Sequence, residues 1–235
     1  MPDKIRFNAL DMVFPLADRQ VEVFKNFELE LDPKEFTVIL GRSGCGKTTL
    51  LRLLSNLIQP TAGKIEMPEN TNIGLMFQEA RLMPWLTCEK NIALGLKNPD
   101  PAQVSEILEL VGLKGFEKAY PDQLSGGMQQ RAALARTLIR HSNLILMDEP
   151  FAALDSFTRE TMQKELLRIR AERGCGVVLV THNIDEALML ADRIVLLSGG
   201  ESLKEYVMPC RDCVRDILTE PYISYKKEIQ ELIRR

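Results

Sequence analysis

The chain has 235 residues, of which 45% are hydrophobic and 27% are charged, and its formal net charge is −3. These values predict one large domain or a domain with a subdomain, and the slightly acidic balance argues against a nucleic-acid partner. No apolar run reaches the ~20 residues that a membrane-spanning helix requires. Residues 1–10 carry no apolar signal-peptide core, so we expect a cytoplasmic protein.

The five cysteines are an odd and scattered set, which argues against a disulfide framework in the cytoplasm. Cys210 and Cys213 alone stand in CxxC spacing. Because no second pair completes a four-ligand zinc site, a metal or redox role for them is the less favoured interpretation.

The first part of the chain predicts strands around a glycine-rich loop. Residues 27–31 alternate apolar and acidic side chains, which indicates a half-buried strand. Residues 36–40 form a continuous apolar run, typical of a strand buried on both faces. After the loop, residues 48–58 predict a helix that ends before Pro60, and residues 72–78 predict another short strand.

The rest of the chain alternates between helices and strands. After a mainly helical stretch at residues 79–140, the patterns predict strands at residues 144–149, 176–182 and 194–198, and helices at residues 156–173 and 184–193. Such alternation predicts a largely parallel sheet with crossover helices. A hairpin-like turn is expected at residues 198–201, and residues 210–235 predict two short helices split at Pro221.

The stretch GRSGCGKTT at residues 41–49 matches the pattern G-x-x-x-x-G-K-[ST] of a phosphate-binding P-loop, with a buried strand before it and a helix after it. Its glycines allow successive backbone N–H groups and the helix N-terminus to face a phosphate chain. Lys47 is expected to reach the β- and γ-phosphates, and Thr48 to offer its hydroxyl to Mg²⁺. The predicted nucleotide-binding residues of the loop are Gly41, Arg42, Ser43, Gly44, Cys45, Gly46, Lys47, Thr48 and Thr49.

The apolar strand at residues 144–147 is followed by Asp148 and Glu149. Asp148 fits the carboxylate that holds Mg²⁺ in P-loop enzymes. Because successive side chains of a strand point to opposite faces, Glu149 is expected to face the attacking water instead of the metal. These residues predict a nucleotide hydrolase. Kinases and motor ATPases remain open, whereas no guanine-reading Asn-Lys-x-Asp stretch supports a GTPase.

The stretch LSGGMQQRAALARTLIRHSNLILMDEPFAALD at residues 124–155 resembles the signature motif of the ABC (ATP-binding cassette) ATPases, followed by their Walker B motif and D-loop. Gln78 resembles the family's Q-loop glutamine, Asp155 the D-loop aspartate and His182 the switch histidine. The resemblance implies an α/β P-loop NTPase fold with a mostly parallel sheet core, an N-terminal antiparallel β region and a helical subdomain.

The resemblance also implies how the chain is divided. We expect an ABC ATPase domain at residues 1–205, with a helical subdomain at residues 79–140 inserted in it, and a C-terminal helical tail at residues 206–235. The expected cofactors are ATP and Mg²⁺. Upstream of the P-loop the family stacks an aromatic ring on adenine, and Phe14 stands at the corresponding place. Phe24 and Phe27 are expected in the core.

The implied catalytic roles agree with the chemistry of the side chains. Glu149 would be the general base that polarises the attacking water, and His182 would contact the γ-phosphate and hold water and phosphate in line. Gln78 would sense both the water and the metal. The predicted metal site consists of Thr48, Gln78 and Asp148.

Ser125, Gly126 and Gly127 open the helix of the signature motif. Serine suits a helix N-cap, the two glycines leave backbone N–H groups open to close approach, and the helix dipole adds partial positive charge. A chain with one P-loop has no evident need for a second anion-binding surface. In the family, two copies pair head to tail about a two-fold axis, so these residues are expected to meet the γ-phosphate that the partner's Lys47 binds.

Residues 79–96 resemble the corresponding stretch in the ATPase subunits of nitrate, sulfonate and taurine importers. This resemblance implies transmembrane permease subunits that contact the Gln78–Trp85 region and a periplasmic or lipoprotein solute-binding protein. It also implies a place at the cytoplasmic face of the membrane. Trp85 either lines a groove for a helix of the membrane subunit or packs in the core of the helical subdomain.

The predicted function is the ATP-hydrolysing motor of an importer for a small anion such as nitrate, a sulfonate or a taurine-like solute. A soluble, non-transport ABC ATPase, for example one of iron–sulfur assembly, is one alternative. An exporter subunit is the other. The coiled-coil or zinc insertions of DNA-linked relatives and the second cassette of translational relatives do not occur in this sequence.

Overall fold

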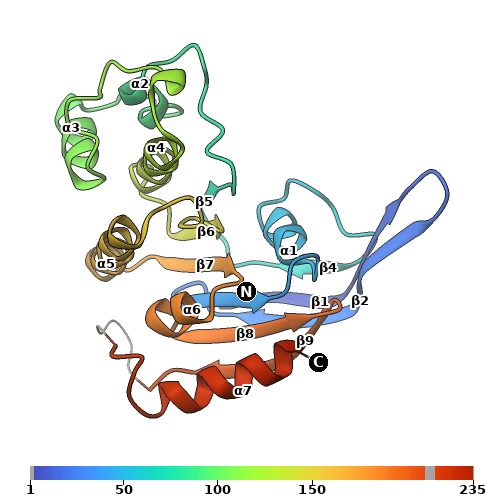
Figure 1. The fold of residues 1–235 in the computed structure, drawn as a ribbon. Coiled ribbons are helices and arrows are strands. Elements are labelled where there is room, and N and C mark those ends of the chain that lie inside the picture. The colour runs from blue at the N-terminus through green and yellow to red at the C-terminus, as the bar shows by residue number, and fades with distance from the viewer. Residues whose placement is uncertain (1–2, 210–214, 235) are drawn as a thin grey trace.

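The computed structural model describes residues 3–209 and 215–234, and Figure 1 shows its elements. The strands are β1 (Ile5–Pro15), β2 (Gln20–Leu31), β3 (Phe36–Gly41), β4 (Ala62–Glu66), β5 (Ile73–Met76), β6 (Leu144–Asp148), β7 (Gly176–Thr181), β8 (Arg193–Ser198) and β9 (Glu201–Val207). The helices are α1 (Lys47–Leu54), α2 (Cys88–Ile92), α3 (Pro101–Leu110), α4 (Gly126–Leu138), α5 (Ser156–Arg173), α6 (Ile184–Leu190) and α7 (Tyr222–Arg234), with a 3-10 turn η1 (Pro121–Gln123). Within the described residues, no helix has the length and apolar character to cross a membrane.

The larger sheet has six strands in the order β5-β6-β7-β3-β8-β9. All neighbouring pairs are parallel except β8 and β9. Every residue of β3, β6 and β7 is buried. Strands that are covered on both faces have continuous apolar sequences, which explains the runs at residues 36–40 and 144–147. The predicted parallel core is confirmed.

The smaller sheet is antiparallel, with its strands in the order β2-β1-β4. Its apolar side chains share one core with α1 and one face of the larger sheet. Phe24 and Phe27 are 1% and 3% exposed, and their ring centroids lie 4.7 Å apart. Their expected place in the core is confirmed.

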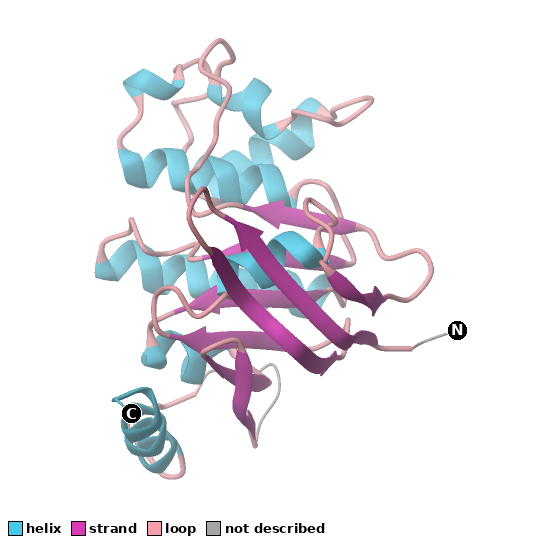
Figure 2. Cartoon of the chain, turned by 90° about the vertical axis from the view of Figure 1, so that its right-hand side faces the viewer, coloured by secondary structure: helices cyan, strands magenta, loops and turns pink. Residues whose placement is uncertain are grey.

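Helices α2, α3 and α4 lie together at one end of the molecule, whereas α7 lies at the other end beside β9 (Figures 1 and 2). The chain enters this helical region after β5 and returns to the sheet at β6. The sequence predicts a mainly helical stretch at residues 79–140, and the structure has three separate helices and one 3-10 turn joined by loops. Apolar residues of α4 belong to the same core as β6 and β7, so α4 connects the helical region to the sheet.

Two predicted boundaries differ from the structure. Helix α1 ends at Leu54 instead of residue 58, because Asn56 has a left-handed φ of 58° with which a right-handed helix cannot continue. Strand β6 ends at Asp148, because Glu149 has a φ of 46°. The second difference matters for the site, since it changes how the glutamate side chain is aimed.

The C-terminal part confirms the hairpin and corrects the tail. Gly199 and Gly200 both have positive φ, as a two-residue hairpin turn between β8 and β9 requires. The prediction of two short helices is wrong for the described residues, because residues 215–221 form turns and only α7 is helical. Cys210 and Cys213 lie outside the described residues. Strand β9 continues past residue 205, and the division into an ATPase domain and a tail stays a proposal.

Candidate functional site

The P-loop connects β3 to α1 with two glycines in left-handed backbone conformations. Gly44 has a φ of 84° and Gly46 a φ of 103°, which glycine adopts without the strain that a side chain would cause. A Cβ at Gly46 would also come within 2.9 Å of the Phe24 ring. The core aromatic on β2 therefore supports the loop from behind, and Lys47 begins α1 at the point where free N–H groups face outward.

Lys47 places its ammonium group at the centre of this loop. Nζ donates to the carbonyl oxygens of Gly41 and Arg42 at 2.8 and 2.9 Å, and the residue is 6% exposed. A cavity of about 270 Å³ opens above the loop. It is lined by Val23, Ser43, Gly44, Gly46, Lys47, Thr48, Thr49, Gln78 and Glu149. The backbone N–H groups of a glycine-rich loop beside one cation suit the binding of a phosphate chain.

Asp148 and Thr48 meet beside this cavity. Burial raises the pKa of the Asp148 carboxyl above its usual value, and the neighbouring Thr48 hydroxyl lowers the pKa in part. Thr48, Asp148 and Gln78 also line an adjoining cavity of about 150 Å³. Hydroxyl, carboxylate and amide oxygens are hard ligands of the kind that Mg²⁺ prefers, so the residues present fit this ion.

Glu149 lines the P-loop cavity and pairs with His182. Glu149 Oε1 lies 2.9 Å from His182 Nδ1. In the sequence analysis, alternation along a strand is the reason given for the Glu149 and Asp148 side chains to point to opposite faces. This reason is wrong, because the strand ends at Asp148. The left-handed backbone of Glu149 turns the side chain instead, and its N–H donates to the Val180 carbonyl at 3.0 Å. A non-glycine residue in this conformation is strained, a feature that clusters at functional sites.

Gln78 lies just beyond β5 and is held by α4. Gln130 Nε2 donates to the Gln78 carbonyl at 3.2 Å, and Arg136 donates to the carbonyls of Ala80 and Arg81 at 2.8 and 2.9 Å. Gln78 therefore lines both cavities from a loop that these hydrogen bonds attach to α4. Sequence patterns did not indicate Gln130 and Arg136, because both occur within an ordinary helical run.

Ser125, Gly126 and Gly127 lie at the start of α4 and do not line the P-loop cavity. Ser125 caps the helix, since its Oγ accepts from the Met128 N–H at 3.3 Å. A Cβ added at Gly126 would meet no atom within 4 Å. Asp155 caps α5 by accepting from the Thr158 N–H at 3.0 Å. Ser125 and Gly126 are exposed and Gly127 is half-buried, and contacts within the chain do not explain the glycine at position 126.

Comparisons with known proteins agree with this geometry. The ABC transporter family model matches residues 24–152. The chain belongs to the ABC transporter family. The predicted ABC ATPase fold and ATP-hydrolysing activity are thereby confirmed.

Several relatives cover most of this ABC transporter chain. An uncharacterized ABC transporter ATP-binding protein of Methanocaldococcus jannaschii is 40% identical over 100% of this chain and 92% of its own length. An aliphatic sulfonates import ATP-binding protein of Bacillus subtilis is 43% identical, covering 87% and 84% of the two chains. A taurine import ATP-binding protein of Pelagibacter ubique is 40% identical, covering 99% and 96%. A solved dimeric ATP-binding cassette bound to ADP and phosphate has a TM-score of 0.80 at 30% identity, covering 88% of this chain and 99% of its own.

Phe14 and Val23 lie on neighbouring strands of the smaller sheet of this ABC cassette. Phe14 lies on β1 opposite Val21 and does not line the phosphate cavity, so its role as the adenine-stacking ring stays a prediction. Val23 lines the cavity from β2. Sequence reasoning missed it, because a single valine on a strand carries no chemical signal.

Trp85 is 69% exposed, so its alternative place in the core of the helical region is wrong. The loop that presents it is fastened by Asn91, which is fully buried on α2. Asn91 Oδ1 accepts from the Met83 N–H at 2.7 Å, and Nδ2 donates to the Leu86 carbonyl at 2.9 Å. An exposed tryptophan on a fixed loop is available for contact with another protein.

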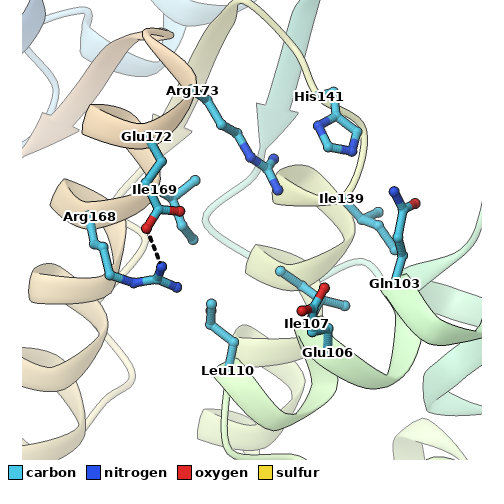
Figure 3. A pocket seen from close by; sticks show the side chains of 10 residues that line it. All are labelled: Gln103, Glu106, Ile107, Leu110, Ile139, His141, Arg168, Ile169, Glu172 and Arg173. Atoms are coloured by element: carbon cyan, nitrogen blue, oxygen red, sulfur yellow. Dashed lines mark hydrogen bonds and ion pairs between the residues drawn. The ribbon is translucent and has the colours of Figure 1, made fainter.

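A further cavity lies apart from the predicted ATP site. It has a volume of about 240 Å³ and lies between α3, the end of α4 and α5 (Figure 3). Its lining includes Arg168, which pairs with Glu172 at 2.5 Å, and Arg173, which donates to the Leu138 carbonyl. Both arginines are thus engaged, and no predicted site residue reaches this cavity.

Cys45 is expected to react slowly with alkylating reagents at neutral pH. Cys45 is only 9% exposed, and burial raises the pKa of its thiol above the usual value. The reactive thiolate is therefore a small fraction of the total at neutral pH. We predict labelling at least about tenfold slower than that of glutathione, with a rate that rises with pH, measured by mass spectrometry of the P-loop peptide. Labelling at the glutathione rate would contradict the inward position of the thiol. Cys88, whose pKa burial raises to about 11, is the still slower internal reference.

Proposed function

We propose that this ABC ATPase is the motor subunit of an importer for small sulfonate- or taurine-like anions. Two of the relatives named above are import ATP-binding proteins, one for aliphatic sulfonates and one for taurine, and they cover 87% and 99% of this chain. The observation that carries the motor role is that Glu149 lines the P-loop cavity and that its Oε1 lies 2.9 Å from His182 Nδ1. A paired carboxylate and imidazole beside a phosphate cradle fit the in-line attack of water on a γ-phosphate.

Each residue has a specific role in this proposal. Lys47 and the backbone N–H groups of residues 41–49 bind the phosphates of ATP, and Asp155 lies at the same nucleotide site in the dimer. Thr48, Asp148 and Gln78 hold Mg²⁺, which neutralises charge on the phosphates. Glu149 accepts the proton of the attacking water. The roles of His182 at the γ-phosphate and of Phe14 at adenine complete the site.

The exposed signature residues support a head-to-tail dimer. Glycine at position 126 is not required by packing within the chain, whereas the close approach of a phosphate requires the absence of a side chain. Two copies related by a two-fold axis provide that phosphate for each other, so that Ser125, Gly126 and Gly127 close the site formed by the partner's Lys47. A solved cassette with the same fold is dimeric.

Other partners follow from the importer role. Transmembrane permease subunits contact the Gln78–Trp85 region, and a periplasmic or lipoprotein solute-binding protein delivers the solute. The chain then resides at the cytoplasmic face of the membrane as a peripheral subunit. Purification from detergent-solubilised membranes tests this assignment. Recovery of a polytopic membrane protein supports transport, whereas recovery of soluble partners alone supports the iron–sulfur assembly type and refutes the importer.

Trp85→Ala is expected to uncouple transport from ATP hydrolysis. The side chain is exposed, so its removal creates no core cavity, and loss of a central aromatic anchor typically costs about 2 kcal/mol or more of binding energy. We predict at least a roughly tenfold loss of solute uptake in reconstituted vesicles, with basal ATPase activity of the isolated subunit unchanged. Phe116→Ala removes another exposed aromatic side chain of the helical region and is the matched control. Uptake that survives Trp85→Ala would remove this loop from the permease contact.

A further inference from the structure

Helix α6 follows directly after the proposed switch histidine. Asn183, the next residue after His182, caps this helix, because its Oδ1 accepts from the N–H groups of Asp185 and Glu186 at 3.0 and 3.2 Å. Glu186 is buried and accepts from Gln163 Nε2 on α5 at 3.1 Å. The position of His182 is therefore set by where α6 begins.

Arg215 closes the opposite end of α6. Its side chain is 2% exposed, and Nη1 donates to the carbonyls of Leu188 and Met189 at 3.3 Å each and to that of Ala191. The last carbonyls of a helix have no donors within the helix, and a cation there is also favoured by the helix dipole. Nη1 of Arg215, from the C-terminal segment, thus supplies the hydrogen-bond donor that the last carbonyls of α6 lack.

Asp192 connects this cap to the ATPase core. Its carboxylate is 1% exposed, with Oδ1 3.7 Å from Arg215 Nη2 and Oδ2 2.5 Å from Arg170 Nη2. The same Oδ2 accepts from the Phe36 N–H at 2.9 Å. Arg170 belongs to α5 and Phe36 to β3. The buried Asp192 carboxylate thus links Arg215, at the end of α6, to α5 and β3.

Helix α7 packs beside α6 at the end of the molecule opposite the helical region (Figure 1). Ile229 is fully buried and Tyr222 is 7% exposed, and both belong to the same core as Leu188 of α6. Lys226 Nζ lies 2.5 Å from Asp185 Oδ1 in the first turn of α6. An exposed ion pair contributes little, so the apolar contacts carry this packing.

We propose that residues 215–234 fix the position of His182 against Glu149 by clamping α6, with Arg215 as a positioning residue. The inference rests on the proposed role of His182 in ATP hydrolysis. It assigns the C-terminal segment a function at the ATP site, although none of residues 215–234 lines the P-loop cavity. A change in the packing of α7 then alters the alignment of water and phosphate without blocking ATP binding.

The full-length chain provides a direct test, because its two histidines, His141 and His182, give two imidazole signals in NMR spectra. Arg215→Ala is expected to shift the His182 signal in the absence of nucleotide and to leave His141 unchanged. It should also lower kcat roughly tenfold with KM for Mg-ATP nearly constant, since small misplacements of a positioned group affect the transition state most. Arg215→Lys should restore only part of kcat, because one ammonium cannot replace the guanidinium fork.

Lys227→Ala, which changes an exposed lysine of α7, is the matched control and should alter neither quantity. An unshifted His182 signal in Arg215→Ala overturns the clamp, whether or not kcat falls, whereas a shifted signal with unchanged kcat refutes the effect of the clamp on hydrolysis. If Arg215→Ala does not fold, the His182 signal and kcat are compared with those of the parent chain in Ile229→Ala and Arg215→Lys instead. Turnover that survives His182→Ala refutes the proposed role of His182, whereas the signal shift without nucleotide tests the clamp independently.

Discussion

Glu149→Gln is expected to stop ATP turnover while leaving ATP binding intact. The amide cannot accept a proton from water, and general bases contribute roughly 10²–10⁴-fold to a rate, so we predict a fall in kcat of at least about 10²-fold. The amide oxygen can still accept from His182 Nδ1, which lies 2.9 Å from the present carboxylate oxygen. The geometry of the site is therefore retained, and the loss reports the proton transfer.

The same variant is expected to accumulate a dimer in the presence of Mg-ATP. A ligand that binds the closed dimer best stabilises it, and hydrolysis removes the γ-phosphate contacts that keep it closed. Light scattering behind a sizing column would show a mass near twice that of the chain with ATP and a single chain with ADP. Glu160→Gln, which alters an exposed carboxylate of α5 that lines neither the P-loop cavity nor the adjoining one, is the control and should turn over normally. A Glu149→Gln protein that hydrolyses ATP as a monomer would refute the base assignment.

The P-loop and the Walker B aspartate could be predicted from sequence because their geometry is local. A strand, a glycine-rich turn and a helix start are enough to fix Lys47 and Thr48, and a buried apolar strand carries Asp148 to the same edge. The direction of the Glu149 side chain was harder to predict from the sequence. A positive φ at a glutamate is rare, so no residue propensity predicts it. Strand alternation correctly predicted that Glu149 and Asp148 point in different directions, but the cause is the left-handed backbone of Glu149.

Long-range contacts were the part that sequence could not provide. Glu149 and His182 are 33 residues apart, and only the family resemblance brought them together. Arg136 and Arg215 act through guanidinium groups that reach main-chain carbonyls of distant segments. Such contacts leave no periodicity or motif in the sequence. From residue type alone, an arginine that binds a distant carbonyl cannot be distinguished from an arginine that points into solvent. They become visible only when burial and donor geometry are known.

Ser125→Arg is expected to abolish the ATP-dependent dimer while sparing nucleotide binding by the single chain. The residue lies at the exposed start of α4, outside the cavity formed by the P-loop. The substitution removes the Oγ that accepts from the Met128 N–H, which costs about 1 kcal/mol of helix stability. A long side chain at this point would occupy the space that the proposed γ-phosphate of the partner requires. Measured in the Glu149→Gln background, the dimer population should fall by at least about tenfold, which corresponds to about 1.4 kcal/mol.

Ser125→Ala separates the two effects of that substitution. It removes the same hydroxyl but adds no bulk, so any loss that both variants share comes from the missing hydroxyl and not from a blocked interface. Fluorescent-nucleotide titration should give both variants nearly the affinity of the parent chain, because the P-loop residues are unchanged. If Ser125→Arg still dimerises with Mg-ATP, the signature residues do not face the phosphate of the partner, and the glycine at position 126 needs another explanation. If instead both variants lose nucleotide binding as single chains, the two anion-binding surfaces belong to one chain, and the head-to-tail arrangement is refuted.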